Sequence, residues 1–191
     1  MTEKIIVISG PSGSGKSTIA KALLSEFHLL EFSVSSTTRT KRAYETDGKD
    51  YYFITEEEFK RLISENEFVE YQEVYEHIFY GTTQSEIKRI INHHKIPLLD
   101  IDVLGAINIK KLYKEKALLI FIHPGNVGTL KSRLLSRKTE NPEMLKKRLD
   151  KAVFELSFAN QFDFVADNSS AVEDCIRTVS EIVRNFIESQ S

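Results

Sequence analysis

The stretch KIIVISGPSGSGKST, residues 4–18, decides the fold of this chain. It joins an apolar, β-branched run to a sequence that fits G-x-x-x-x-G-K-[ST], with Gly10, Gly15, Lys16 and Ser17 at the fixed positions. A glycine-rich turn between a strand and a helix points successive backbone N–H groups inward at the positive end of the helix dipole, where phosphate binds. The lysine can reach the outer phosphates, and the serine hydroxyl can join the shell of Mg²⁺. We therefore expect a nucleoside triphosphate here, held by Gly10, Pro11, Ser12, Gly13, Ser14, Gly15, Lys16, Ser17 and Thr18. The loop alone leaves three classes open: a hydrolase or switch, a kinase, and a binding module that has kept the fold.

The composition is that of a globular protein without a general attraction for polyanions. Of the 191 residues, 41% are hydrophobic and 28% are charged, and the net charge is −2. That balance argues against nucleic acid and membrane partners, so any anion site must be local. The single cysteine, Cys175, excludes an internal disulfide and a zinc cluster, and it lies in an apolar helical stripe, where we expect it to be buried. Because the chain shows neither an N-terminal signal region nor an apolar run of 18 residues, we expect a cytoplasmic protein. We expect it to be a monomer or a homodimer.

Short apolar runs alternate with amphipathic segments along the chain. This alternation predicts an α/β fold with a parallel five-stranded sheet flanked by helices. The strands are expected at residues 4–9, 32–35, 96–102, 117–122 and 162–166. Helix starts are predicted by capping boxes and by a proline at the first helical position: Thr55 with Glu58, Thr83 with Glu86, Ser170 with Glu173, and Asn141 before Pro142.

Two segments depart from this alternation. Between residues 36 and 97, short aromatic runs such as YYFI and FVEY alternate polar with apolar residues, which predicts a small mixed α+β insert. Residues 124–147 are rich in Arg and Lys and have few large apolar residues, as expected for a helical lid over a site. We therefore divide the chain into a phosphate-loop core (1–34, 98–124 and 147–191), an insert (35–97) and a lid (125–146).

Two further pairs of charged residues are candidates for binding phosphate and a divalent cation. Arg39 and Arg42 stand three apart in the polar stretch SVSSTTRTKR, residues 33–42, and arginine forks grip phosphate oxygens in a bidentate manner. Taken alone, two arginines in a polar loop are as a rule a solvated surface. Asp100 and Asp102 alternate near the carboxyl end of a predicted strand, where ligands gather in open α/β sheets. Two like carboxylates at that place make sense beside a divalent cation.

Taken together, these motifs resemble the guanylate kinase family. The stretches FSVSSTTRTKR, GKDYYFI, NEFVEY, YGTT, LLDID and RKTENPEMLKKRL follow the family's order, and the match runs from about residue 4 to residue 168. The chain departs from the family's pattern in HIFYG, residues 77–81, and at Leu104 and Lys138. The resemblance implies a phosphate-loop kinase core with a GMP-binding insert and a helical lid. It further implies in-line transfer of the γ-phosphate of ATP to GMP or dGMP with Mg²⁺, a step of purine nucleotide metabolism.

The resemblance also implies a role for each residue that matches a family motif. GMP would be held by Ser35, Arg39, Arg42, Tyr51, Glu70, Tyr80, Gly81, Thr82, Asp100 and Asp102. Phosphoryl transfer would depend on Lys16, Arg39, Arg42, Arg137 and Arg148. ATP would also be contacted by Arg133, Arg137 and Asn168, and Mg²⁺ would be held by Ser17 and Asp100, partly through water.

The chemistry of Glu70 agrees with this assignment independently. Guanine presents an N1–H and an exocyclic N2–H₂ side by side, and one ionised carboxylate accepts both, whereas the edge of adenine would leave that carboxylate unpaired.

Three alternatives stay open at this point. A non-catalytic guanylate-kinase-like module is disfavoured by the complete loop at residues 10–18. A P-loop GTPase or regulatory ATPase is disfavoured because the chain has no Asn-Lys-x-Asp motif for guanine. A kinase acting on a sugar phosphate is disfavoured by Glu70 together with Arg39 and Arg42.

Overall fold

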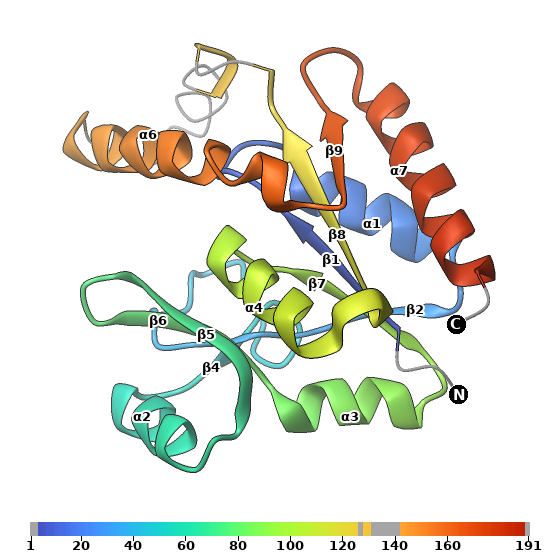
Figure 1. The fold of residues 1–191 in the computed structure, drawn as a ribbon. Helices are drawn as coiled ribbons and strands as arrows, with labels where there is room; N and C mark the ends of the chain where they lie inside the picture. The colour runs from blue at the N-terminus through green and yellow to red at the C-terminus, as the bar shows by residue number, and fades with distance from the viewer. Residues whose placement is uncertain (1–3, 126–127, 131–141, 190–191) are drawn as a thin grey trace.

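A five-stranded sheet forms the centre of the computed structural model, which describes residues 4–125, 128–130 and 142–189 (Figure 1). The strands lie in the order β2-β7-β1-β8-β9, and every neighbouring pair is parallel. Their bounds are β1 (Ile5–Ser9), β2 (Leu30–Phe32), β7 (Ile96–Asp100), β8 (Ala117–His123) and β9 (Phe164–Asp167). The predicted α/β fold class is confirmed.

Helices cover both faces of this sheet (Figure 1). One face carries α1 (Lys16–Glu26) and α7 (Val172–Glu188), and the other carries α3 (Gln84–Asn92), α4 (Val103–Tyr113) and α6 (Pro142–Leu156). Because side chains alternate along a strand, Ile6 and Ile8 pack with α1 and α7, whereas Ile5 and Val7 pack with α4. Burial on both faces explains the uninterrupted apolar run of β1. Cys175 is 2% exposed in the first cluster, as predicted.

A second sheet of four strands is built from the segment between β2 and β7. Its order is β4-β3-β6-β5, with bounds β3 (Ser36–Thr37), β4 (Tyr52–Phe53), β5 (Phe68–Tyr75) and β6 (Ile78–Thr83). β3 pairs parallel with β4, and β6 pairs antiparallel with both β3 and β5. The helix α2 (Glu56–Ser64) packs on this sheet through Phe59, which is fully buried and stacks on Phe68 at a centroid distance of 4.4 Å. The mixed character predicted for residues 36–97 is confirmed.

Two of the three predicted capping boxes are confirmed. Thr55 accepts a hydrogen bond from the backbone N–H of Glu58, and Thr83 accepts one from that of Glu86. The capping box at Ser170 was wrong, because α7 begins one residue later with Ala171 at the N-cap and no capping side chain. Pro142 is the first residue of α6, as predicted, while Asn141 lies outside the described residues.

Two strand predictions need correction. Residues 33–35 are not a core strand, because β2 ends at Phe32 and the chain crosses there to β3 in the second sheet. β7 ends at Asp100, so Asp102 is not part of the strand but the N-cap of α4, where its side chain accepts from the backbone N–H of Gly105. Two short 3₁₀ turns, Lys114–Lys116 and Ala159–Gln161, precede β8 and β9.

Among the described residues, no helix combines the length and the apolarity needed to cross a bilayer.

Candidate active site

A cavity of about 340 Å³ opens where the carboxyl ends of β1 and β7 face the second sheet. The core lines it with Gly10, Ser12, Gly13, Gly15, Lys16, Ser17, Thr18, Asp100, Ile101 and Asp102. The segment that forms the second sheet adds Ser35, Arg39, Arg42, Glu45, Tyr51, Glu70, Val74 and Tyr80. Helix α6 adds Arg148, Lys151 and Glu155. Most residues predicted for the site therefore meet at one cavity, although Pro11, Ser14, Gly81, Thr82 and Asn168 are not among its lining residues. Arg133 and Arg137 lie outside the described residues.

The loop between β1 and α1 closes tightly around its own backbone. Gly10 has a φ of 137° and Gly15 a φ of 100°. A Cβ atom at Gly10 would lie 2.6 Å from the carbonyl oxygen of Ile122, so the loop cannot form without glycine there. The Nζ of Lys16 donates to the carbonyl oxygens of Gly10 at 2.7 Å and Pro11 at 3.3 Å. The lysine is thus held on the loop itself, next to the N–H groups that would bind a phosphate.

Asn168, the residue after β9, holds this loop by a buried hydrogen bond. It is 3% exposed, and its Nδ2 donates to the carbonyl oxygen of Ser14 at 2.7 Å. A Cβ atom at Gly15 would lie 2.3 Å from the same Nδ2, which is the second place where the loop requires glycine. This contact fixes the loop, and the predicted contact of Asn168 with ATP stays a prediction.

Asp100, the last residue of β7, and Asp102, the N-cap of α4, have different hydrogen-bond partners. The hydroxyl of Ser17 donates to Oδ2 of Asp100 at 3.2 Å, whereas Oδ1 of Asp102 accepts from the backbone of Gly105 at 2.9 Å. Burial raises the pKa of Asp100, although nearby Lys16 acts against the shift. A hydroxyl and a carboxylate oxygen fit a hard cation such as Mg²⁺. Within the described residues no three His, Cys, Asp or Glu side chains gather as a metal site, so the remaining ligands of such an ion would be phosphate oxygens and water.

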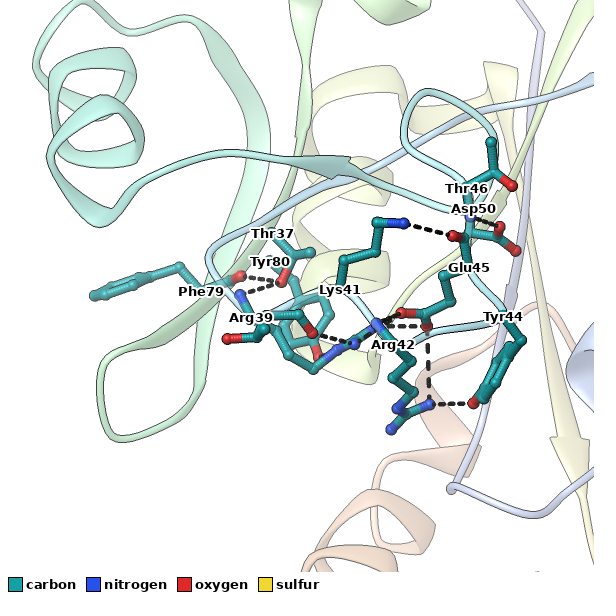
Figure 2. Close-up of polar contacts among 11 residues, drawn as sticks. Thr37, Arg39, Lys41, Arg42, Tyr44, Glu45, Thr46, Asp50, Phe79 and Tyr80 are labelled. Atoms are coloured by element: carbon teal, nitrogen blue, oxygen red, sulfur yellow. Dashed lines mark hydrogen bonds and ion pairs between the residues drawn. The ribbon is translucent and has the colours of Figure 1, made fainter.

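Arg39 is fixed by a carboxylate that sequence reasoning missed (Figure 2). Its NH1 and NH2 donate to the two carboxylate oxygens of Glu45 at 2.9 and 2.7 Å, and its Nε donates to the hydroxyl of Tyr80 at 3.1 Å. Glu45 is only 7% exposed and also accepts from the backbone N–H of Arg42 at 2.8 Å. The hydrogen bonds from Arg39 hold the pKa of Glu45 below its usual range, despite burial. The signal in the sequence was an acid three residues after Arg42, inside an otherwise basic loop.

Arg42 remains more accessible than Arg39. Its side chain is 49% exposed, against 16% for Arg39, and its NH1 donates to the hydroxyl of Tyr44 at 3.0 Å (Figure 2). Tyr51 lies beneath the Arg39 guanidinium, with 5.4 Å from its ring centroid to Cζ, and burial raises the pKa of its hydroxyl to about 12. The Tyr51 hydroxyl therefore stays protonated and can donate to an anion at neutral pH.

Glu70 is a buried carboxylate on the side of the cavity that the second sheet lines. It is 6% exposed and accepts hydrogen bonds from the side chain and backbone of Thr82, whose hydroxyl lies 3.3 Å from that of Ser35. Burial raises the pKa of Glu70 to about 7. A Cβ atom at Gly105 would lie 2.5 Å from Oε2 of Glu70, so glycine in the first turn of α4 makes room for the carboxylate. Gly81 is a structural neighbour, since its Cβ would lie 2.8 Å from that of Tyr71.

One face of α6 completes the cavity. Arg148 was predicted, whereas Lys151 and Glu155 were missed, although their spacing of three and four residues places all three on one helical face. Glu155 is 5% exposed and accepts a hydrogen bond from the backbone N–H of Ser12. The helix is therefore tied directly to the phosphate loop.

The pKa of Glu70 predicts a stability gain when its charge is removed. A folded-state pKa of about 7, above the ordinary 4.5, means that the protonated form stabilises the fold at low pH and that this contribution is lost as the pH rises toward 7. Glu70→Gln should therefore gain stability over the wild type by roughly 2–3 kcal/mol more at pH 8 than at pH 5. Urea unfolding across this range measures the difference. Glu73→Gln, an exposed position of the same strand, is the control. A Glu70→Gln difference that does not change with pH would contradict the assignment.

Comparison with known proteins agrees with this geometry. The sequence model of the guanylate kinase family matches residues 2–186. A guanylate kinase of Porphyromonas gingivalis is 45% identical over 185 residues, which are 96% of this chain and 98% of that protein. One of Bacteroides thetaiotaomicron is 42% identical over 190 residues, covering 100% of this chain and 93% of the relative. The crystal structure of guanylate kinase from Anaplasma phagocytophilum has a TM-score of 0.80 and 33% identity, over 99% of this chain and 88% of that one. In sequence and in fold, the chain belongs to the guanylate kinase family.

Proposed function

We propose that this protein transfers the γ-phosphate of ATP to GMP, giving ADP and GDP. The observation that carries the proposal is that a phosphate loop, a pair of arginines and a buried carboxylate with hydroxyl neighbours all border one cavity. The loop suits a triphosphate, the arginines suit the phosphate of a second nucleotide, and the carboxylate suits guanine. The family supplies the same assignment independently.

On the ATP side, the loop from Gly10 to Thr18 would bind the phosphates through its backbone N–H groups. Lys16 donates to the carbonyl oxygens of Gly10 and Pro11 at 2.7 and 3.3 Å, and it would exchange these partners for a phosphate oxygen when the triphosphate binds. Ser17 and Asp100 would hold Mg²⁺, partly through water, and the ion would neutralise charge on the phosphates. Arg148 lines the same cavity from α6, and we assign Arg133 and Arg137, together with Arg148, to the lid side of the ATP phosphates.

On the GMP side, Arg42 is the more available of the two arginines. Glu45 already accepts hydrogen bonds from NH1 and NH2 of Arg39, so Arg39 would attract the phosphate mainly as a positive charge held in one place. The half-exposed guanidinium of Arg42 can turn to the phosphate. The hydroxyls of Tyr51 and Tyr80 would add neutral donors. The phosphate of GMP has a second pKa near 6, so it is largely ionised at neutral pH and the transfer needs no general base.

Glu70 would read the base. Its carboxylate is held by Thr82, with Ser35 beside that threonine, and Asp102 stands near enough to raise its pKa further. The N1–H and N2–H₂ groups of guanine stabilise the ionised form, whereas adenine offers no such pair and would leave a buried charge without partners. A site built on such bonds rejects the wrong base by large factors.

Positioning and exclusion of water complete the mechanism. Two polyanions must be brought into line, and water competes as the nucleophile, so the site must close before transfer. We propose that residues 35–97 act as the GMP-binding insert and residues 125–146 as the lid, moving on hinges near residues 35, 97, 124 and 147. With one cysteine in the sequence, we place the protein in the reducing cytoplasm.

A coupled assay of ADP formation tests the proposal directly. The acceptors are GMP, dGMP, AMP and ribose bisphosphate, each with ATP and Mg²⁺. We expect turnover with GMP and none above background with AMP or the sugar phosphate, while dGMP reports on contacts to the ribose. Failure to convert GMP to GDP would overturn the proposed function.

Lys16→Met should lower kcat by roughly 100-fold or more, because it removes a positive charge aimed at the transferred group. Steady-state kinetics with GMP and ATP measure this loss. The matched control is Lys21→Met, an exposed lysine of the same helix, which should keep full activity. Equal activities of the two variants would remove Lys16 from the reaction.

Gly105→Ala should weaken GMP use without harming the fold. Alanine is the better helix former at this position, and the atom it would meet is the far end of the Glu70 side chain, so the protein should fold with that carboxylate displaced. We expect the KM for GMP to rise about tenfold, which corresponds to about 1.4 kcal/mol. The KM for ATP, measured in the same preparation, should stay within about twofold. An unchanged KM for GMP would show that the position of Glu70 does not matter for binding.

A further inference from the structure

Glu86 is a buried carboxylate outside the cavity. It is 3% exposed, at the third position of α3, and both carboxylate oxygens accept two hydrogen bonds. Oε1 accepts from the backbone N–H of Val34 at 2.8 Å and from NH2 of Arg89 at 2.9 Å. Oε2 accepts from Nε of Arg89 at 2.9 Å and from the hydroxyl of Tyr52 at 3.3 Å. Burying a charge is costly unless it is fully paired, so a carboxylate kept here needs a reason beyond capping the helix.

The backbone group that Glu86 binds belongs to the crossing between the two sheets. Residues 33–35 connect β2 in the first sheet to β3 in the second. Ser33 donates its backbone N–H to the carbonyl oxygen of Leu98 in β7, and the carbonyl oxygen of Ser35 accepts from the backbone N–H of Tyr52 in β4. The N–H of Val34 lies between these two anchors, and Glu86 satisfies it. Tyr52 thus binds Ser35 through its backbone and Glu86 through its hydroxyl, which closes a ring of contacts around the crossing.

The position of this ring affects Ser35, Thr82 and Glu70 at the cavity. Ser35 lines the cavity, and its hydroxyl lies 3.3 Å from that of Thr82, which in turn holds Glu70. A shift of the backbone at Val34 would therefore move Ser35 relative to both. Arg89, which pairs with Glu86, also forms an ion pair with Glu31 of β2. The network therefore also contacts the strand that precedes the crossing.

We propose that Glu86 is a positioning residue that fixes the crossing at Val34 and thereby sets the geometry of the GMP site. The proposal rests on the proposed function, because it names a residue that acts on GMP through Ser35 and Thr82. Glu86 itself does not line the cavity.

The second sheet's own helix offers a matched control. Glu58 holds the third position of α2 after a threonine cap, as Glu86 does in α3, and it pairs with the arginine three residues later. Arg61 donates Nε and NH2 to the two oxygens of Glu58 at 2.9 and 2.7 Å, the same fork as in α3. The Glu58 side chain, however, is 41% exposed, and its pairing stays within α2. Truncating either glutamate removes a fork to the arginine three residues later, but only Glu86→Ala frees the crossing.

Two measurements test the role of Glu86. In the free protein, amide hydrogen exchange at Val34 should be about tenfold faster in Glu86→Ala than in the wild type, and unchanged in Glu58→Ala. In the assay, Glu86→Ala should raise the KM for GMP about tenfold and leave the KM for ATP within about twofold. Glu86→Gln keeps one oxygen for Val34 but loses the fork to Arg89. Its KM for GMP should therefore lie between that of the wild type and that of Glu86→Ala.

The outcomes separate this inference from the proposed function. If the wild type converts GMP and folded Glu86→Ala has an unchanged KM for GMP, or loses ATP and GMP affinity equally, Glu86 is not a positioning residue although the activity stands. If the wild type does not convert GMP, the proposed function fails, and unchanged exchange at Val34 would reject the contact as well. Should Glu86→Ala not fold, Glu86→Gln decides: an about threefold rise in the KM for GMP alone supports the role, and no rise overturns it.

Discussion

The close turn between β1 and α1 is the constraint on which the rest of the structure depends. Its backbone passes within contact distance of the carbonyl of Ile122 and the amide of Asn168, so the loop fits only because β8 and the segment after β9 are already in place. In this arrangement the central strands do more than form a core. Their parallel order brings the ends of β1, β7 and β8 together, and that edge is where the loop, Asp100 and the support for the loop must meet.

Buried acids organise the cations of this site. A pocket for two nucleotides needs positive charge, but long basic side chains lose much conformational entropy when they are held in place. Glu45 holds Arg39 through both carboxylate oxygens, and Glu155 ties α6 to the loop beside Lys16. In each case the acid is at least nine-tenths buried, while the base reaches the cavity. Glu45 therefore fixes the direction of Arg39, whereas Glu155 fixes the place of α6 against the phosphate loop.

Local sequence patterns predicted several elements, and the features set by distant residues were missed. The apolar run of β1, the glycine spacing of the loop, and the caps at Thr55 and Thr83 are all visible in a short stretch of sequence, and all were predicted correctly. Residues 33–35 look like a strand but cross between sheets, because Leu98, Tyr52 and Glu86 take their backbone groups. The last of these partners is 52 residues away, and no local pattern reports it. Family resemblance identified Glu70 and Arg39, which border the cavity, but not the glycine and the acid that hold them.

In the role proposed for it, Glu70 would be both a cost to stability and a source of selectivity. Without a ligand, Glu70 is a buried carboxyl whose pKa of about 7 reflects the penalty of ionising it in that place. In the proposed role, guanine would bring two donors to the ionised carboxylate, and their hydrogen bonds would offset the penalty of ionising it. Adenine presents one donor and one acceptor at the same edge, so it would leave one oxygen of the ionised carboxylate unpaired. Under the proposed function, discrimination between the two bases would thus follow from burial, because the same carboxylate at an exposed position would be satisfied by water and would distinguish them only weakly.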